Sequence, residues 1–327
     1  MPDAIALRGV TKTFGDTVAV RGLDLVVPQG ALYGVIGPNG AGKTTAIRMI
    51  LSILLPDRGE LSVLGLRSAL DAKNRIGYLP EERGLYKRMR VGPFLAYMAR
   101  LKEVNDTGLD ARIRSWLDRV GLGGVEGKRC EELSKGMQQK VQFLAAIIHR
   151  PDLLILDEPF AGLDPVNQRL IRELVLEEHR RGATVLFSTH IMAHAEQLCD
   201  HVVMIHQGVK VLDDEIGAIR ARYDPRSLVF ESLDPDADAS GLNRIPGVNA
   251  VRKDGAAWEI SLSPAADRAT VIRQVASVVP PARIELRRPT LEDVFIGIVS
   301  DAPAGAGGDV LRAAISDRGD APGGGSR

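Results

Sequence analysis

Hydrophobic and polar positions follow two different repeats along the first two thirds of the chain. Short apolar runs at residues 31–36, 153–156 and 183–187 are typical of buried strands. Apolar residues at residues 166–180 and 191–199 instead recur at the spacing of one helix face. Strands that alternate with helices predict an α/β fold, with a mostly parallel sheet and helices on both of its faces.

The pattern before and after the first buried run is also informative. Residues 4–10 and 23–27 indicate strands joined by turns, and the turn sequence Pro28-Gln29-Gly30 precedes the apolar run. A glycine-rich loop follows that run, and residues 44–54 are expected to form a helix. The order is therefore strand, loop and helix.

A helical insert is expected in the middle of the chain. Residues 93–122 have an amphipathic helical pattern, and Ser134 is placed to open a further helix. Pro151-Asp152 then separates that helix from the next apolar run. We expect this helical region to span about residues 85–150.

The character of the sequence changes near residue 224. Residues 225–300 combine alternating strand patterns with helical ones and predict a small α+β domain, with Thr290 and Asp293 placed to cap its last helix. The larger domain would then occupy residues 1–222. Residues 301–327 consist mainly of Ala, Gly, Asp and Pro, so we expect a disordered tail.

Composition and charge exclude several classes of protein. The 42 Lys and Arg residues balance 42 Asp and Glu residues, so no long-range attraction toward nucleic acid is expected. Cys130 and Cys199 lie far apart and have no zinc-ligand spacing, which favours a reducing cytosol. The first residues do not resemble a secretory signal, and no apolar run approaches the roughly 20 residues of a membrane span. A cytoplasmic protein is expected, reaching a membrane only through a partner.

The loop at residues 37–44 fits the pattern G-x-x-x-x-G-K-[ST] between a strand and a helix. Its glycines let backbone N–H groups surround phosphates at the positive end of the helix. We expect Lys43 to reach the β- and γ-phosphates of ATP, and the Thr44 hydroxyl to bind Mg²⁺. The predicted nucleotide-binding residues of this segment are Gly37, Pro38, Asn39, Gly40, Ala41, Gly42, Lys43, Thr44 and Thr45.

Two carboxylates end the apolar run at residues 153–156. Asp157 is expected to hold Mg²⁺, and Glu158 to accept a proton from the attacking water as general base. An isolated Asp-Glu pair at a strand end is more often merely solvated. Together with the phosphate loop, the pair favours a catalytic role.

Further segments narrow the family. Leu133-Ser134-Lys135-Gly136-Met137-Gln138-Gln139 resembles the signature segment of ABC ATPases. The chain also carries segments similar to the family's D-loop, switch-histidine loop, Q-loop region and adenine-stacking aromatic, which are residues 160–164, 188–190 and 76–81 and Phe14. Over about residues 4–220, the chain resembles the ATP-binding subunit of an ABC transporter.

This resemblance implies a P-loop NTPase cassette with an antiparallel β subdomain and a helical subdomain. It also implies a head-to-tail dimer, in which Ser134 and Gly136 of one chain contact ATP bound to the other. A serine at a helix N-cap suits this role, because its hydroxyl and the following N–H groups point toward an anion. His190 would hold the attacking water, so Lys43, Glu158 and His190 are the predicted catalytic residues.

Three residues depart from the family pattern. Lys135 and Met137 replace the usual Gly and Gln of the signature segment. Glu81 stands where the family usually has a glutamine that contacts Mg²⁺, and a carboxylate can still bind that ion. His194 is interpreted as structural, because it does not belong to an H-E-x-x-H motif.

The resemblance implies an ATP-hydrolysing subunit that energises transport through separate membrane permease subunits, at the inner face of the cell membrane. The single cassette, the small C-terminal domain and residues 79–86 are similar to ATPases of ABC-2-type exporters, including the sodium- and drug-efflux groups. The basic residues 83–90, with Leu85 and Tyr86, are expected to receive a cytoplasmic helix of the permease.

Two alternatives remain open. A soluble ABC ATPase acting on nucleic acid or ribosomes would usually carry tandem cassettes or a long coiled coil, and this chain has neither pattern. A regulatory module that binds ATP without hydrolysing it would not need Lys43, Asp157, Glu158 and His190 together. Both alternatives fit the sequence less well than a transporter ATPase.

Overall fold

A computed structural model describes residues 2–82, 84–222, 227–234, 236–263, 265–287 and 289–299. The chain divides after Ile216 into two compact units. The predicted tail at residues 301–327 lies outside the described residues. None of the helices in the described ranges combines the length and the apolar character that a membrane crossing requires.

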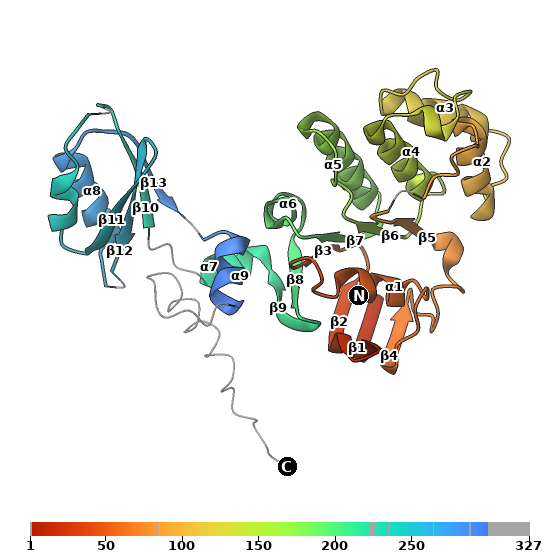
Figure 1. Cartoon of the computed structure of the whole chain (residues 1–327), viewed down its shortest axis with the longest axis horizontal. Coiled ribbons are helices and arrows are strands. Elements are labelled where there is room, and N and C mark those ends of the chain that lie inside the picture. The colour runs from red at the N-terminus through yellow and green to blue at the C-terminus, as the bar shows by residue number, and fades with distance from the viewer. Residues whose placement is uncertain are drawn as a thin grey trace, which may run out of the picture. The chain divides into compact units, whose positions relative to one another are not determined.

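A six-stranded sheet forms the centre of the first unit (Figure 1). Its first five strands run parallel, and the last pairs antiparallel with its neighbour. In order across the sheet, the strands are β5 (Ile76–Leu79), β6 (Leu153–Asp157), β7 (Thr184–Thr189), β3 (Leu32–Ile36), β8 (His201–His206) and β9 (Val209–Glu215). The α/β fold with a mostly parallel sheet is thereby confirmed.

A second, antiparallel sheet covers one face of this unit. Its strand order is β2 (Thr17–Pro28), β1 (Asp3–Phe14) and β4 (Arg58–Val63). Helix α1 (Lys43–Ile50) contacts β2, β4 and β6, and a single buried apolar cluster joins these elements to the central sheet. The cluster fixes where α1 begins, and so where the phosphate loop lies.

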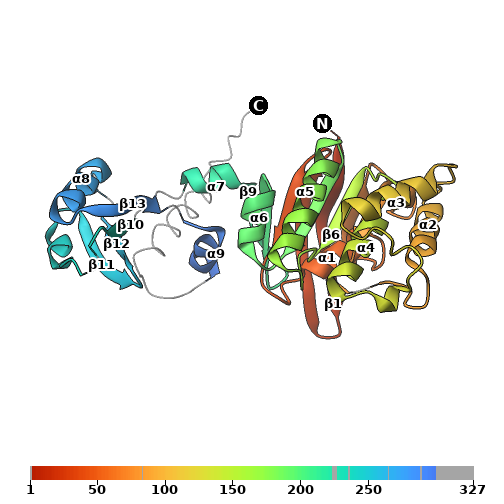
Figure 2. The ribbon, with the colours of Figure 1, turned by 90° about the horizontal axis from the view of Figure 1, so that it is seen from above.

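Helices α4 (Lys135–Ile147) and α5 (Pro165–Arg180) pack on the opposite face of the central sheet (Figure 1). Helices α2, α3 and α4 gather beside α5 in Figure 2. Helix α6 contacts β3 and β7. The bounds of these helices are α2 (Val91–Leu101), α3 (Leu109–Arg119), α4 (Lys135–Ile147), α5 (Pro165–Arg180) and α6 (Met192–Leu198).

The end of helix α1 differs from the sequence prediction. Helix α1 ends at Ile50 and not near residue 54, because Ser52 adopts a left-handed conformation (φ 56°) and the N–H groups of Ile53 and Leu54 turn back to Arg48 O. The apolar spacing continues past that turn, so the pattern alone could not reveal it. The helical pattern predicted over about residues 93–122 corresponds to the two helices α2 and α3.

The second unit has an antiparallel sheet of order β11 (Val248–Asp254), β12 (Ala257–Leu262), β10 (Ser227–Ser232) and β13 (Pro281–Arg287). Helix α8 (Arg268–Val278) contributes Val271 and Val275 to an apolar core with Leu228, Phe230 and Ile260. The unit also contains α7 (Ile216–Arg222), the 3₁₀ helix η3 (Ser240–Arg244) and α9 (Leu291–Val299). With η3 in the place of the first helix, the element order from β10 to β13 is that of a ferredoxin-like fold.

Candidate functional site

Four loops that carry the predicted site residues meet at one edge of the central sheet. The parallel strands β3, β5, β6 and β7 all end at this edge. The phosphate loop follows β3, Glu81 follows β5, Asp157 and Glu158 end β6, and His190 follows β7. In an open α/β sheet this edge is where ligands bind.

Two glycines give the phosphate loop its path. Gly37 (φ 151°) and Gly42 (φ 104°) lie in the region of backbone space that disfavours side chains. A Cβ atom at Gly37 would overlap Ile205 O, and one at Gly42 would overlap Ala19 O. The loop therefore lies directly against β8 and β2, with α1 starting at Lys43.

Lys43 is held inside this loop with 6% of its surface exposed. Its Nζ donates to Gly37 O (2.8 Å) and Pro38 O (3.1 Å) and lies 4.0 Å from Glu158 Oε1. Burial lowers the pKa of Lys43, although the charges of Glu158, Asp157 and Glu81 raise it. The ammonium group is thus centred among the loop carbonyls and the carboxylates of the sheet edge.

Asp157 has one satisfied and one unsatisfied carboxylate oxygen. Ser188 Oγ donates to Oδ1, whereas Oδ2 is buried and has no hydrogen-bond partner among the described residues. Burial raises the pKa of Asp157, while the nearby Ser188 and Thr44 hydroxyls lower it. A buried carboxylate oxygen near a hydroxyl is a donor set that fits Mg²⁺, which prefers oxygen ligands.

Glu158 and His190 form one hydrogen-bonded unit. Glu158 adopts a left-handed backbone conformation (φ 50°), and its Oε1 accepts a bond from His190 N (2.8 Å). The same oxygen lies 2.8 Å from His190 Nδ1, and Oε2 accepts a bond of 3.3 Å from Thr189 Oγ1. The predicted general base and the predicted switch histidine therefore contact each other directly.

The remaining predicted residues are more exposed. Glu81 is exposed, and its charge acts on Lys43. Phe14 ends β1 with 48% of its surface exposed, and Lys12 Nζ lies 5.6 Å from its ring centroid. The exposed ring offers a face on which a planar base can stack.

The signature segment begins α4. Ser134 is the N-cap, and its Oγ accepts a bond of 3.3 Å from Met137 N. Ser134 and Lys135 are exposed, and Gly136 is partly buried. Among the described residues, Ser134 has no hydrogen bond to the phosphate loop. The segment is therefore open to contact with another molecule.

Several supporting residues escaped the sequence interpretation. The hydroxyls of Ser188 and Thr189 bond to Asp157 and Glu158, although only His190 was singled out in that segment. Gln139 and Gln142, on the inner side of α4, donate to Pro159 O (3.3 Å) and Glu82 O (3.1 Å). Gln139 ends the signature segment, but no sequence pattern marks its bond or that of Gln142, because both bonds join segments that are distant along the chain.

Two family models match the chain. The model described as "ABC transporter" matches residues 20–161, and the one described as "ATP-binding protein DrrA1-3-like, C-terminal domain" matches residues 215–299. The first covers the phosphate loop, the signature segment, Asp157 and Glu158. The second covers the whole described part of the second unit.

Curated proteins and solved structures agree with these matches. YhaQ of Bacillus subtilis, an ABC transporter ATP-binding protein, is 40% identical over 89% of this chain and 97% of its own length. The daunorubicin resistance ATP-binding protein DrrA3 of Streptomyces coeruleorubidus is 32% identical over 91% and 96%. A solved ATP-binding subunit of an ABC transporter superposes with a TM-score of 0.63 at 30% identity, over 67% of this chain and 93% of that one.

Proposed function

This chain belongs to the ATP-binding proteins of ABC transporters, and on that premise we propose how its own residues bind and hydrolyse ATP. The family supplies the reaction, which is the hydrolysis of ATP to power transport. We propose the residue roles, the bound metal, the dimer and the membrane partner.

Phosphate binding is assigned to the loop from Gly37 to Thr45. Its backbone N–H groups and the N-terminus of α1 face the bound phosphates. Lys43 exchanges its bonds to Gly37 O and Pro38 O for bonds to the β- and γ-phosphates. The exposed ring of Phe14 stacks on the adenine.

Mg²⁺ binding is assigned to Thr44 and Asp157, with Glu81 as a third oxygen donor from the end of β5. Asp157 Oδ2 supports this assignment, because it is buried without a hydrogen-bond donor among the described residues. When bound, the ion neutralises charge on the β- and γ-phosphate oxygens.

The hydrolytic step is assigned to Glu158 and His190. Glu158 removes a proton from a water molecule as the water oxygen attacks the γ-phosphorus and the bond to the leaving ADP oxygen breaks. His190 orients Glu158 through Nδ1 and is left with Nε2 for the γ-phosphate or the water. The contact between Glu158 and His190 is the observation that carries this proposal.

Replacing Glu158 by Gln tests the assignment. The variant keeps the shape and the hydrogen-bonding capacity of the side chain but loses the base, so ATP turnover should fall by at least about 100-fold. ATP binding should remain, because Lys43 and the loop are intact. Turnover is measured with the membrane subunit present, and binding with a fluorescent ATP analogue.

Glu60→Gln, which changes an exposed glutamate on β4, is the matched control and should retain wild-type turnover. Equal turnover in the wild type and Glu158→Gln would refute the role of Glu158. A wild type that binds ATP but does not hydrolyse it would instead favour the regulatory module.

We further propose that two copies pair head to tail, so that Ser134 and Gly136 of one copy contact the γ-phosphate held by the other. The exposed N-terminus of α4 supports this pairing. ATP should then convert the Glu158→Gln variant from monomer to dimer in size-exclusion chromatography. Ser134→Arg should prevent that conversion, because a larger side chain occupies the phosphate position.

The partner in the membrane is proposed to be a permease subunit, which holds this protein at the inner face of the membrane. Export is the proposed direction, since a relative matched along almost its whole length is named for daunorubicin resistance. Moving a toxic compound outward is the direction that confers resistance.

A further inference from the structure

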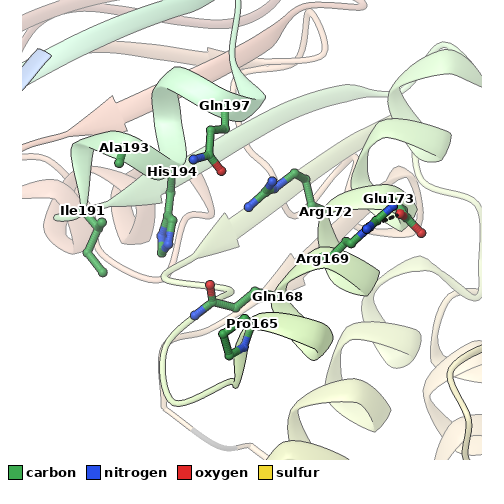
Figure 3. A pocket seen from close by; sticks show the side chains of 9 residues that line it. All are labelled: Pro165, Gln168, Arg169, Arg172, Glu173, Ile191, Ala193, His194 and Gln197. Atoms are coloured by element: carbon green, nitrogen blue, oxygen red, sulfur yellow. Dashed lines mark hydrogen bonds and ion pairs between the residues drawn. The ribbon is translucent and has the colours of Figure 1, made fainter. Parts of the chain in front are cut away.

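A hollow of the first unit lies between α5 and α6, next to the loop that carries His190. It has a volume of about 580 Å³, within the range of small-molecule sites. Figure 3 shows Gln168, Arg169 and Arg172 of α5 on one side and His194 and Gln197 of α6 on the other. None of these five residues has a role in the proposed ATP site.

Arg172 is the cation of this hollow that lacks a counter-ion. It is partly buried, its Nε is fully shielded, and it forms no hydrogen bond or ion pair with a described residue. Arg169, one turn earlier, pairs with Glu173 at 3.0 Å, and Figure 3 shows these two side chains meeting away from Arg172. A shielded guanidinium nitrogen without a hydrogen-bond acceptor is costly, so a bound anion would stabilise Arg172.

His194 faces the same space and carries no negative charge that could balance Arg172. Burial lowers the pKa of His194, and the charges of Arg172 and His190 lower it further, against the opposite effect of Glu158. The imidazole is therefore neutral near pH 7. Neutral imidazole offers one N–H donor, and the amides of Gln168 and Gln197 offer more.

We propose that this hollow is a binding site for a small oxyanion, a carboxylate or phosphate group held by Arg172 with His194 and Gln197. A planar guanidinium matches both groups in geometry through paired N–H donors. Among the lining residues Glu173 is the acid, and Arg169 already neutralises it. The lining therefore carries one net positive charge that an anion can balance.

The site also contacts the catalytic loops. The His194 ring packs edge-on against Phe160, with ring centroids 5.0 Å apart, and Phe160 follows Glu158 by two residues. His194 itself follows His190 by four residues on the same loop and helix. An anion that fixes the position of His194 would therefore also affect Glu158, through Phe160, and His190, through the shared loop and helix.

Anion titration of the full-length protein tests this proposal. Saturating Mg-ADP first fills the phosphate loop, and sodium succinate or inorganic phosphate is then added at constant ionic strength, with binding followed by calorimetry. The wild type should show saturable binding of at least one anion. The anion with the lower dissociation constant identifies whether the natural group is a carboxylate or a phosphate.

Arg172→Gln should weaken this binding by about ten-fold or more, since it removes the charged donor. Arg180→Gln is the matched control, because it makes the same charge change at the exposed end of the same helix and should bind as the wild type does. An equal loss of anion affinity in both variants would mean that only the net charge of the protein matters, and would contradict the proposed site. Absence of saturable binding to the wild type would overturn it too.

His194→Glu provides a second test that does not depend on the folding of Arg172→Gln. A carboxylate at this position places a counter-ion opposite Arg172, so the variant should melt at a higher temperature and lose the added anion. His194→Gln should keep the anion, because its amide still donates. Undiminished anion binding by His194→Glu would contradict the proposed location.

Discussion

At the scale of single residues, Gly37 and Gly42 show how closely the phosphate loop is fitted to its neighbours. Both glycines have positive φ angles, and at each one a Cβ atom would overlap a backbone carbonyl of another strand. Gly40 also has a positive φ (78°), but no other atom lies within 4 Å of its Cβ position. Substitution of Gly40 would therefore introduce backbone strain alone, whereas substitution of Gly37 or Gly42 would add a steric overlap to that strain.

Gly37→Ala should move the loop away from β8 and abolish ATP binding, with a loss of stability of about 1–3 kcal/mol from the backbone strain alone. Gly40→Ala should lose less stability, because the added methyl group meets open space. Urea unfolding and ATP-analogue binding check both variants. Similar losses of stability and of ATP binding in the two variants would show that overlap with Ile205 O does not determine the effect of Gly37→Ala.

His149, at the end of α4, should make the protein sensitive to acid. Its Nε2 lies 3.1 Å from Ile76 O, and its Nδ1 is buried without a partner in the part of the chain that the structure describes. Burial and the charges of Lys102 and Arg181 lower its pKa to about 4 from 6.5. The unfolded chain takes up the proton below pH 6.5, whereas the folded protein does so only near pH 4.

The stability that His149 contributes is therefore complete above pH 6.5 and is lost as the pH falls toward 4, by up to about 3 kcal/mol. His149→Gln keeps a donor toward Ile76 O but does not titrate. The variant should lose less unfolding free energy than the wild type between pH 7.5 and pH 4.5, as urea unfolding at each pH will measure. Parallel losses in the two proteins would exclude this histidine as the cause.

At the scale of elements, the segment after β5 forms an exposed aromatic surface with α2. Tyr86 is 51% exposed and meets Phe94 and Tyr97 edge-on, at centroid distances of 6.0 and 5.9 Å. Tyr97 and Leu101 of α2 are also largely exposed. An apolar surface with basic residues around it suits a cytoplasmic helix of the permease. Arg83 of this predicted contact lies outside the described residues.

Replacing Leu85 and Tyr86 together by Asp should reduce copurification with the membrane subunit by at least about ten-fold, because two charges would be buried in the contact. ATP binding should be unchanged. Val26→Asp, at an exposed apolar position of β2, is the control and should copurify normally. Unaltered copurification of the double variant would remove this surface from the proposed interface.

At the scale of the whole molecule, the two units have separate apolar cores. One core joins the antiparallel sheet, α1 and the central sheet, and the other lies between α8 and the four-stranded sheet of the second unit. Separate cores predict separate unfolding transitions. Mg-ATP should raise the melting temperature of the first unit alone, because a ligand stabilises the unit to which it binds.

Phe230→Ala should reduce the unfolding free energy of the second unit alone, by about 3–5 kcal/mol, since Phe230 is fully buried in the core of that unit. The melting temperature of that unit should fall accordingly. Differential scanning calorimetry of the full chain, with and without Mg-ATP, measures both effects. Val35→Ala removes apolar volume from the core of the first unit and should lower the melting temperature of that unit instead. A single transition that responds to both variants would mean that the units unfold together.

The sequence by itself determined the features that depend on neighbouring residues. Backbone conformation and strand-to-helix order are local properties, so the phosphate loop, the Asp157-Glu158 pair and the Ser134 N-cap could be found from spacing alone. The α/β fold class and the resemblance to transporter ATPases are both confirmed. The roles of Lys43, Glu158 and His190 stay predictions until the variants are measured.

The tertiary structure decided which distant residues meet. Glu158 and His190 are 32 positions apart and touch because β6 and β7 are neighbours in the sheet. The bonds of Gln139 and Gln142 likewise depend on how the helices pack, and so do the positions of Arg172 and His194 on the two sides of one hollow. Such contacts arise when burial brings separate segments together, and no local pattern of hydrophobic and polar residues encodes them.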